Sequence, residues 1–274
     1  MPAMLRIDIQ KRTGIAVYMT YLSKKAVLYA LLGLFSVAAW GQEVGGEGVG
    51  AQTVVVGVDH SPPYRILDAG RQSGLYLDIF NEVADRLGWR VEYERVPFRR
   101  ILLLMQEGKV DVMLGPVRTE NRAAYMAYAT PAFPPERRLF FYTEPENRVT
   151  RYSDLYGKSI GVLEGARYFE RFDKDDQLKK STAPRYQNLM LMLEKGRVDV
   201  VVAPELAGLS AARNVQVEVE VSPFSVPGER SWIAISRKSP ILEYADEIAE
   251  VVEAIRQEGL MDRLVTKYSN LAVK

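Results

Sequence analysis

A threonine and an arginine three positions apart provide the clearest binding chemistry in the sequence. Thr119 and Arg122 follow an apolar run that ends at Gly115. Threonine is a favoured N-cap, so we expect a helix to begin at Thr119, with its unpaired backbone N–H groups beside the Arg122 guanidinium. A guanidinium offers a carboxylate two parallel hydrogen bonds, whereas an ammonium acts as a point charge. These residues therefore predict a site for a carboxylate group.

Two further arginines extend this chemistry. Arg118 precedes Thr119, and Arg167 lies in the second half of the chain. Together with Arg122 they would favour a ligand with more than one anionic group. Alternatively, any of the three pairs with an acidic side chain of the protein itself, for which the candidates are Glu120, Glu164 and Glu205.

The residues that several kinds of catalysis require are missing. The sequence has no cysteine and one histidine, His60, so it can form no disulfide, no Cys–His pair and no cysteine zinc site. Without a second histidine, His60 is better explained as a polar loop residue than as a metal ligand. Gly157, Lys158 and Ser159 resemble the end of a phosphate-binding loop, but Tyr152 stands where its first glycine belongs. We therefore expect no enzymatic activity, no cofactor and no metal.

Composition narrows the choice of partner. The 274 residues are 47% hydrophobic and 26% charged, with a net charge of +1. These are ordinary values for a globular protein, and they give no electrostatic footprint for nucleic acid or for an anionic membrane. A small molecule remains as the expected partner.

The elements that position these residues alternate between β-branched runs and amphipathic segments. Thr53–Val58 indicates a buried strand, and a proline loop at Ser61–Tyr64 follows it. Apolar residues at helical spacing predict a helix over Gly74–Leu87 that ends at Gly88. This alternation predicts an α/β fold with mainly parallel sheets.

A short segment occurs twice and divides the chain into similar halves. Leu103–Pro116 reads LLMQEGKVDVMLGP, and Leu191–Pro204 reads LMLEKGRVDVVVAP. In each copy, a glycine able to end a helix precedes Val-Asp and a strand that stops at proline. We infer two similar lobes whose sheets present their ligand-binding ends to one shared cleft.

The first lobe is predicted to comprise residues 53–143 and 232–274, and the second lobe residues 144–231. Helical segments over 241–268, broken at Gly259, are too long to pack on the second lobe alone, so the chain must return to the first. We expect one crossing along Arg138–Thr143 and the other just before Ser231–Ser236. Paired crossings make a hinge that permits closure on a ligand.

The N-terminal segment is predicted to be a leader. Lys24 and Lys25 precede the apolar residues Ala26–Ala39, and small residues lie where a signal peptidase cleaves. These 14 residues are fewer than the roughly 18 that span a bilayer. We expect a signal peptide within residues 1–39, with the part before Met19 an upstream extension, and a Gly-rich linker over residues 40–52. With no cysteine to carry a lipid, the mature protein is expected to be a monomer free in the periplasm.

From Thr53 to the C-terminus, the order of several motifs resembles the family 3 extracellular solute-binding proteins, the polar amino-acid-binding components of ABC importers. The motifs are Gly57-x-Asp59 with the proline loop, Gly74 to Ile79, both Gly-basic-Val-Asp segments, Thr119-x-x-Arg122, Tyr128 to Pro131 and Asp154 to Val162. The resemblance implies a fold like the type II periplasmic binding proteins, with two α/β lobes, a two-strand hinge and a cleft between the lobes. It also implies capture of a small carboxylate-bearing solute, an amino acid or a related compound, and its delivery to the membrane subunits of an ABC importer.

The resemblance further assigns roles to residues. It implies that Arg122 holds the ligand's α-carboxylate and that Phe98 stacks on the ligand. The full set of ligand-binding residues expected in this way is Asp59, Ser61, Tyr64, Phe98, Gly115, Val117, Arg118, Thr119, Arg122, Ala166, Arg167 and Glu205.

Two departures from the family pattern concern the ligand. Arg167 stands where the family often has a hydroxyl side chain, and the usual acid for the ligand's α-ammonium aligns with Pro204, beside Glu205. Either Glu205 takes over that role or the ligand has no α-ammonium. The fold also resembles periplasmic cyclohexadienyl dehydratases, in which Glu205 would be the acid, and ligand sensors that dock to a membrane receptor. Both remain alternatives to a transport function.

Overall fold

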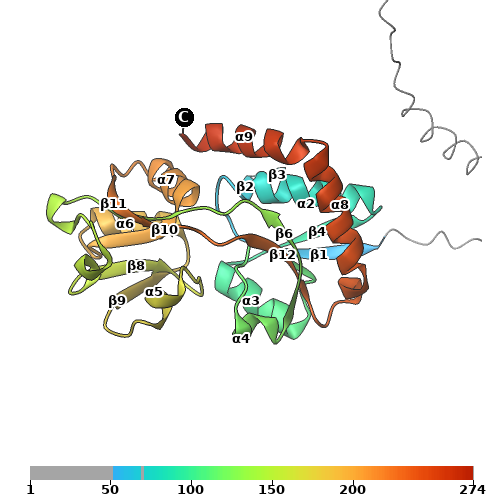
Figure 1. The fold of residues 1–274 in the computed structure, drawn as a ribbon, viewed down its shortest axis with the longest axis horizontal. Coiled ribbons are helices and arrows are strands. Elements are labelled where there is room, and N and C mark those ends of the chain that lie inside the picture. Colours follow the sequence, from blue (N-terminus) through green and yellow to red (C-terminus); the bar gives the residue numbers. More distant parts are fainter. Residues whose placement is uncertain (1–51, 69–70, 274) are drawn as a thin grey trace, which may run out of the picture. The chain divides into compact units, whose positions relative to one another are not determined.

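Two five-stranded sheets with helices packed on them account for most of the described chain (Figure 1). The computed structural model describes residues 52–68 and 71–273. The predicted signal peptide, and the predicted linker apart from Gln52, lie outside the described residues. Their assignment stays a prediction.

The first sheet has the strand order β4–β1–β5–β12–β6. β1 runs parallel to β4 and β5, and β12 runs antiparallel to its neighbours β5 and β6. A small hairpin of β2 and β3 follows the proline loop. The elements of this part are β1 (Thr53–Val58), β2 (Ile66–Asp68), β3 (Arg71–Ser73), α2 (Leu75–Arg86), β4 (Arg90–Arg95), α3 (Phe98–Glu107), β5 (Val112–Leu114), α4 (Glu120–Ala123), β6 (Met126–Phe133) and β12 (Ser231–Ser236).

The second sheet has the order β11–β7–β10–β8–β9, which is the same topology read from the other edge. β8 runs parallel to β9 and β10, and β7 runs antiparallel to its neighbours β10 and β11. Its elements are β7 (Arg138–Tyr142), β8 (Ser159–Leu163), α5 (Glu170–Lys174), β9 (Lys179–Ala183), α6 (Tyr186–Glu194), β10 (Val200–Pro204), α7 (Glu205–Asn214) and β11 (Glu220–Val226), with short 3₁₀ turns at Pro145–Asn147 and Tyr152–Leu155. The two lobes therefore share one fold.

The repeated Val-Asp segment has the same structural role in both lobes. Asp111 precedes β5 and accepts a hydrogen bond from the Val55 backbone N–H at 2.8 Å. Asp199 precedes β10 and accepts one from the Ser159 backbone N–H at 2.7 Å. The glycine before each aspartate, Gly108 or Gly196, has a positive φ of 78° or 62°. Each copy thus ends a helix and fixes the next strand to its parallel neighbour, β5 to β1 and β10 to β8.

The chain crosses between the sheets at residues 134–137, just before β7, and at residues 227–230, just before β12 (Figure 1). The sequence-based expectation placed Arg138–Thr143 at the end of the first lobe, whereas the structure pairs β7 with two strands of the second sheet. An apolar run satisfies the interior of either sheet, so its sequence does not distinguish them. The crossings touch: a Cβ on Gly228 would lie 1.6 Å from the Glu136 carbonyl oxygen, so only glycine fits there.

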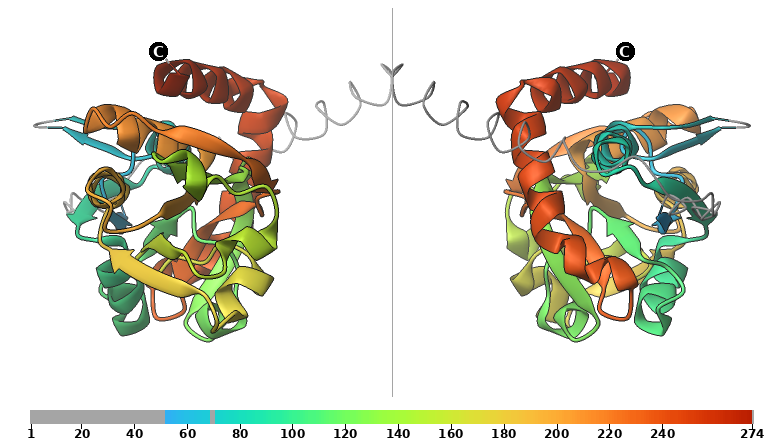
Figure 2. Two further views of the ribbon diagram at one scale, coloured as in Figure 1. Left: turned by 90° about the vertical axis from the view of Figure 1, so that its left-hand side faces the viewer. Right: turned by 90° about the vertical axis from the view of Figure 1, so that its right-hand side faces the viewer.

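The C-terminal helices connect both lobes. After a 3₁₀ turn at Pro240–Tyr244, α8 (Ala245–Gln257) packs on β6 and α2, and α9 (Leu260–Val273) packs on α2 and α7. Gly259, with a φ of 70°, makes the break between them. Figures 1 and 2 show α9 leaving α8 and passing over α2 toward α7. The tail thus packs on helices and a strand of the first lobe, and its last helix also contacts the second.

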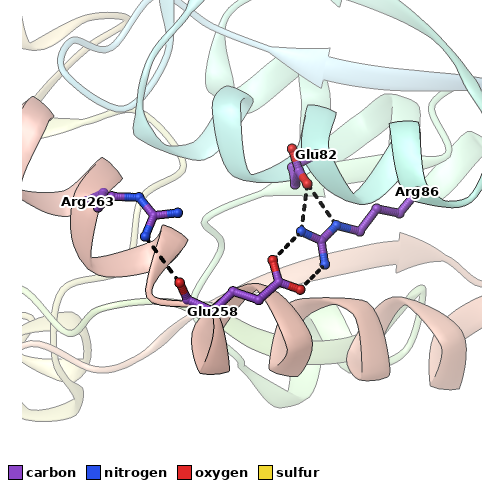
Figure 3. A network of polar contacts seen from close by, with 4 residues as sticks. All are labelled: Glu82, Arg86, Glu258 and Arg263. Carbon is purple, nitrogen blue, oxygen red and sulfur yellow. Dashed lines mark hydrogen bonds and ion pairs between the residues drawn. The ribbon is translucent and has the colours of Figure 1, made fainter.

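An ion-pair network fixes the corner between α8 and α9 (Figure 3). Arg86 of α2 donates to Glu82 one turn earlier at 2.8 Å and to both oxygens of Glu258 at 2.8 and 2.7 Å. Arg263 donates to the Glu258 carbonyl oxygen at 3.1 Å. The Glu258 carboxylate, and to a smaller extent that of Glu82, raises the pKa of Arg86. Because the network faces solvent, its contribution to the free energy of unfolding is small. It serves mainly to hold α2 beside the corner between α8 and α9.

Candidate ligand-binding cleft

The loops at the carboxyl ends of the parallel strands of both sheets enclose a cleft beside the crossing segments. The volume of the cleft that is open to the centre of a water molecule is about 80 Å³. Since a single water needs roughly 10–15 Å³ on this measure, the cleft has room for a small molecule. Its lining residues are Ser61, Tyr64, Arg65, Tyr76, Phe98, Gly115, Pro116, Val117, Arg122, Glu136, Arg138, Leu163, Ala166, Arg167, Tyr168, Tyr186, Pro204, Ala207 and Ser231.

Arg122 links the two walls of the cleft. The residue is 5% exposed, and its guanidinium donates to the Val117 carbonyl oxygen at 3.1 Å and to the Gly165 carbonyl oxygen of the second lobe at 3.0 Å. It also lies over the Phe98 ring, 5.8 Å from the centroid. Burial lowers the pKa of Arg122, yet arginine stays protonated in proteins at neutral pH. A nearly buried positive charge therefore stands between the lobes.

Thr119 positions this arginine. Its hydroxyl accepts a hydrogen bond from the Arg122 backbone N–H at 3.3 Å, as the sequence predicts for an N-cap. The helix that it begins, α4, covers only Glu120–Ala123. One turn sums too few peptide dipoles to attract an anion strongly, so the expected contribution of free helical N–H groups is not supported. The guanidinium itself is the charged group at this point.

Arg65 is held by an acid behind the cleft. Asp59 pairs with Arg65 at 2.9 Å, and both side chains are nearly buried. Arg65 also donates to the Leu114 carbonyl oxygen at 3.2 Å. Asp59 is therefore occupied by the protein, and it does not line the cleft.

Glu136, in the first crossing, is the only acidic residue among the described residues that line the cleft. One of its carboxyl oxygens accepts from the Tyr64 hydroxyl and the other from the Leu206 backbone N–H. The residue as a whole is half-buried, but its carboxyl end is enclosed by these partners. Burial raises the pKa of Glu136 to about 7, against the lowering effect of the Leu206 N–H and of Arg138.

Arg138, at the start of β7, is 6% exposed. It donates to the Glu136 carbonyl oxygen at 2.9 Å. Its Nε atom is buried and has no hydrogen-bond partner among the residues that the structure describes. A buried donor without an acceptor is costly, so this unpaired atom in a cleft-lining residue needs an explanation.

Ten of the twelve residues expected from the sequence, all but Asp59 and Glu205, line the cleft or a depression beside it. Eight line the cleft, namely Ser61, Tyr64, Phe98, Gly115, Val117, Arg122, Ala166 and Arg167. Arg118 and Thr119 instead line an adjoining outer depression, together with Arg122 and Arg167. Whether any of them contacts a ligand stays a prediction.

Glu205 lies outside the cleft lining. It makes a two-fold ion pair with Arg137, at 3.0 and 2.8 Å, and these side chains are 29% and 58% exposed. His60 is equally occupied, because its Nδ1 accepts from the Leu67 backbone N–H at 3.1 Å. Burial lowers the pKa of His60. Within the described range, no group of three or more His, Cys, Asp or Glu residues could hold a metal ion.

Reasoning from the sequence missed the lining residues Arg65, Tyr76, Glu136, Arg138, Tyr168, Tyr186 and Ser231. Glu136 and Arg138 belong to the run Pro135–Arg138 (PERR), which connects two apolar strands. A charged run inside an interlobe crossing is the signal that could have found them.

The fold and the cleft define a two-lobed α/β protein of the binding-protein class. The model of the bacterial extracellular solute-binding proteins, family 3, matches residues 54–270, and the chain belongs to this family. No described helix is long and apolar enough to cross a membrane.

Relatives support the class. A putative ABC transporter arginine-binding protein 2 of Escherichia coli (strain K12) is 26% identical over 65% of this chain and 70% of its own length. A solved ancestral arginine-binding protein bound to arginine superposes with a TM-score of 0.69 over 79% of this chain and 97% of its own, at 24% identity, which shows the fold. Some relatives are enzymes: a membrane-bound lytic murein transglycosylase F of Nitrosospira multiformis is 24% identical over 79% of this chain, but over only 46% of its own length.

Proposed function

We propose that this protein is a periplasmic solute-binding protein that captures a small carboxylate-bearing solute by lobe closure and delivers it to an ABC importer. The observation that carries the proposal is the nearly buried Arg122 guanidinium between the two lobes. Two of its donors already join Val117 and Gly165, one carbonyl on each side. A carboxylate bound to the remaining donors would connect the same two walls. The relative named as an ABC transporter component supports the delivery step.

The contacts between the lobes support closure on the ligand. Arg99 of α3 pairs with Glu164 at 3.4 Å, so a second contact from the first lobe reaches the loop of the second lobe that holds Gly165. Because both contacts cross from lobe to lobe, a ligand that strengthens either one favours the closed arrangement. The dehydratase alternative required Glu205 as an acid in the cleft, and the Arg137 pair outside the cleft lining gives it no support.

The experiment is a thermal-shift panel of the twenty amino acids, short dicarboxylates and small peptides. A true ligand at a hundred times its Kd adds about 2.7 kcal/mol to the free energy of unfolding. We expect Arg122→Gln to abolish the ligand-induced shift. The variant's own apo melting temperature is the reference, since losing two buried hydrogen bonds also lowers stability.

Arg100→Gln is the matched control, because Arg100 is an exposed arginine of α3 that does not line the cleft. It should keep the full shift. Equal Kd values for Arg122→Gln and the wild type would remove Arg122 from the site, and turnover of a bound compound would replace the transport function by an enzymatic one.

A further inference from the structure

The charges around the cleft are unbalanced. Arg65 is neutralised by Asp59, whereas Arg122, Arg138 and Arg167 face the cleft with Glu136 as the one acid among the described lining residues. Two more guanidinium groups than carboxylates therefore remain. Arg122 and Arg138 are nearly buried, whereas Arg167 is exposed. Because buried charges need partners, the two buried guanidinium groups call for a ligand that brings an anionic group to each.

The two most buried of these cations come from opposite lobes. Arg122 follows β5 of the first sheet, and Arg138 opens β7 of the second. Both are nearly buried, and the Arg138 Nε is the buried donor that lacks a partner among the described residues. A ligand with an anionic group at each end would satisfy both guanidinium groups and draw the lobes together.

Among the described lining residues, the cleft offers a cationic group on the ligand no carboxylate that is free of other hydrogen bonds. Both oxygens of Glu136 already accept hydrogen bonds, from Tyr64 and Leu206. Glu205 is occupied by Arg137, and Asp59 by Arg65. An α-ammonium would therefore be desolvated among arginines and tyrosines without a free carboxylate.

We propose, on the basis of the proposed function, that the ligand is a short dicarboxylate without an ammonium group. One carboxylate binds Arg122 and the other binds Arg138, with the exposed Arg167 at the mouth of the cleft. The small volume of the cleft favours a short carbon chain. Arg138 is then a specificity-determining residue that selects the second carboxylate.

Isothermal titration with three four-carbon acids tests this proposal directly. Succinate and aspartate differ by one ammonium, and succinate and butyrate differ by one carboxylate. Glutarate, glutamate and pentanoate make the same comparison with five carbons. We expect succinate or glutarate to bind at least ten-fold more tightly than its two matched compounds, which corresponds to about 1.4 kcal/mol.

Variants assign the effect to a side chain. Arg138→Gln should reduce the dicarboxylate-to-monocarboxylate affinity ratio to about one, while Arg122→Gln should weaken both acids. Arg138→Lys keeps the positive charge and should retain part of the affinity ratio. This variant provides a second measurement if Arg138→Gln fails to fold. Arg137→Gln is the control, because this neighbouring arginine faces away from the cleft in its pair with Glu205, and it should leave the ratio unchanged.

The possible failures can be told apart. If aspartate or glutamate binds as tightly as its matched dicarboxylate, this inference is wrong while the proposed function stands. If none of the six compounds binds, this inference is also wrong, and the wider thermal-shift panel decides the proposed function separately. An unchanged affinity ratio in a folded Arg138→Gln variant would show that another residue selects the second carboxylate.

Discussion

Glu136 is an acid in a position that disfavours its ionised form. Its carboxyl oxygens accept hydrogen bonds from the Tyr64 hydroxyl and the Leu206 N–H. The charges of Arg138 and Glu205 also act on its pKa. Burial raises its pKa from 4.5 to about 7. Between these two values the folded protein holds a proton that the unfolded chain releases. The contribution of this group to the free energy of unfolding is therefore greatest below pH 4.5. It is lost as the pH rises from 4.5 through about 7.

We predict that Glu136→Gln removes this pH dependence. At about 1.4 kcal/mol per pH unit of separation, the wild type should lose on the order of 2 kcal/mol relative to the variant between pH 5 and pH 8. Urea unfolding of both proteins at these pH values measures the difference. Glu146→Gln, at an exposed position, should show no such change. A constant difference between Glu136→Gln and wild type across the range would contradict the raised pKa.

Neighbouring residues show what the sequence can and cannot predict about the site. Arg137 and Arg138 are adjacent and identical in type, yet one lies in an exposed ion pair and the other in the cleft. Arg137 belongs to the crossing and Arg138 opens β7, so the side chain that enters the cleft depends on where β7 begins to pair with β10. Arg122 was predictable because its place after a strand and a threonine cap is local. Arg138 was not, because its environment comes from the opposite lobe.

At the scale of elements, the repeated Val-Asp segment explains why the fold was predictable. Its glycine, aspartate and apolar strand act on their immediate neighbours, so a pattern in sequence becomes the same local geometry twice. The expected strands at Thr53–Val58 and Ser231–Ser236 have the observed bounds. Strand order is different, because β7 is an apolar run that either sheet could accept, and its pairing depends on where the chain crosses.

The two aspartates provide a matched pair of mutations. Asp199→Ala removes the acceptor for the Ser159 N–H and should cost about 1–2 kcal/mol of stability. Asp111→Ala removes acceptors for the Val55 N–H and for the Ser239 hydroxyl, which donates at 2.6 Å, and should cost about 1 kcal/mol more. Urea unfolding measures both, and Glu194→Ala at an exposed helix end is the control. Equal costs would mean that the Ser239 hydrogen bond contributes nothing.

At the scale of the whole described chain, α9 is a third connection between the lobes. The Tyr268 hydroxyl accepts from the Gly74 N–H at 3.0 Å and donates to Asp78 at 2.6 Å, which fixes α9 to the start of α2. On the second lobe, Arg213 of α7 donates to the Leu271 carbonyl oxygen at 3.2 Å. Motion of the lobes about the two crossings must therefore slide or release α9.

We predict that Tyr268→Phe lowers the local stability of both lobes at once. The substitution leaves the buried Gly74 N–H without its acceptor, so it should cost about 1–3 kcal/mol. Lys267→Gln removes a different contact to the same Asp78, at 2.9 Å, but Lys267 is half exposed and the cost should stay below about 1 kcal/mol. Hydrogen exchange distinguishes the variants by location. In Tyr268→Phe, amides of α7 in the second lobe should exchange faster together with those at the start of α2, because α9 covers both. Faster exchange at α2 with unchanged α7 would show that α9 belongs to the first lobe alone and places no restraint on the hinge.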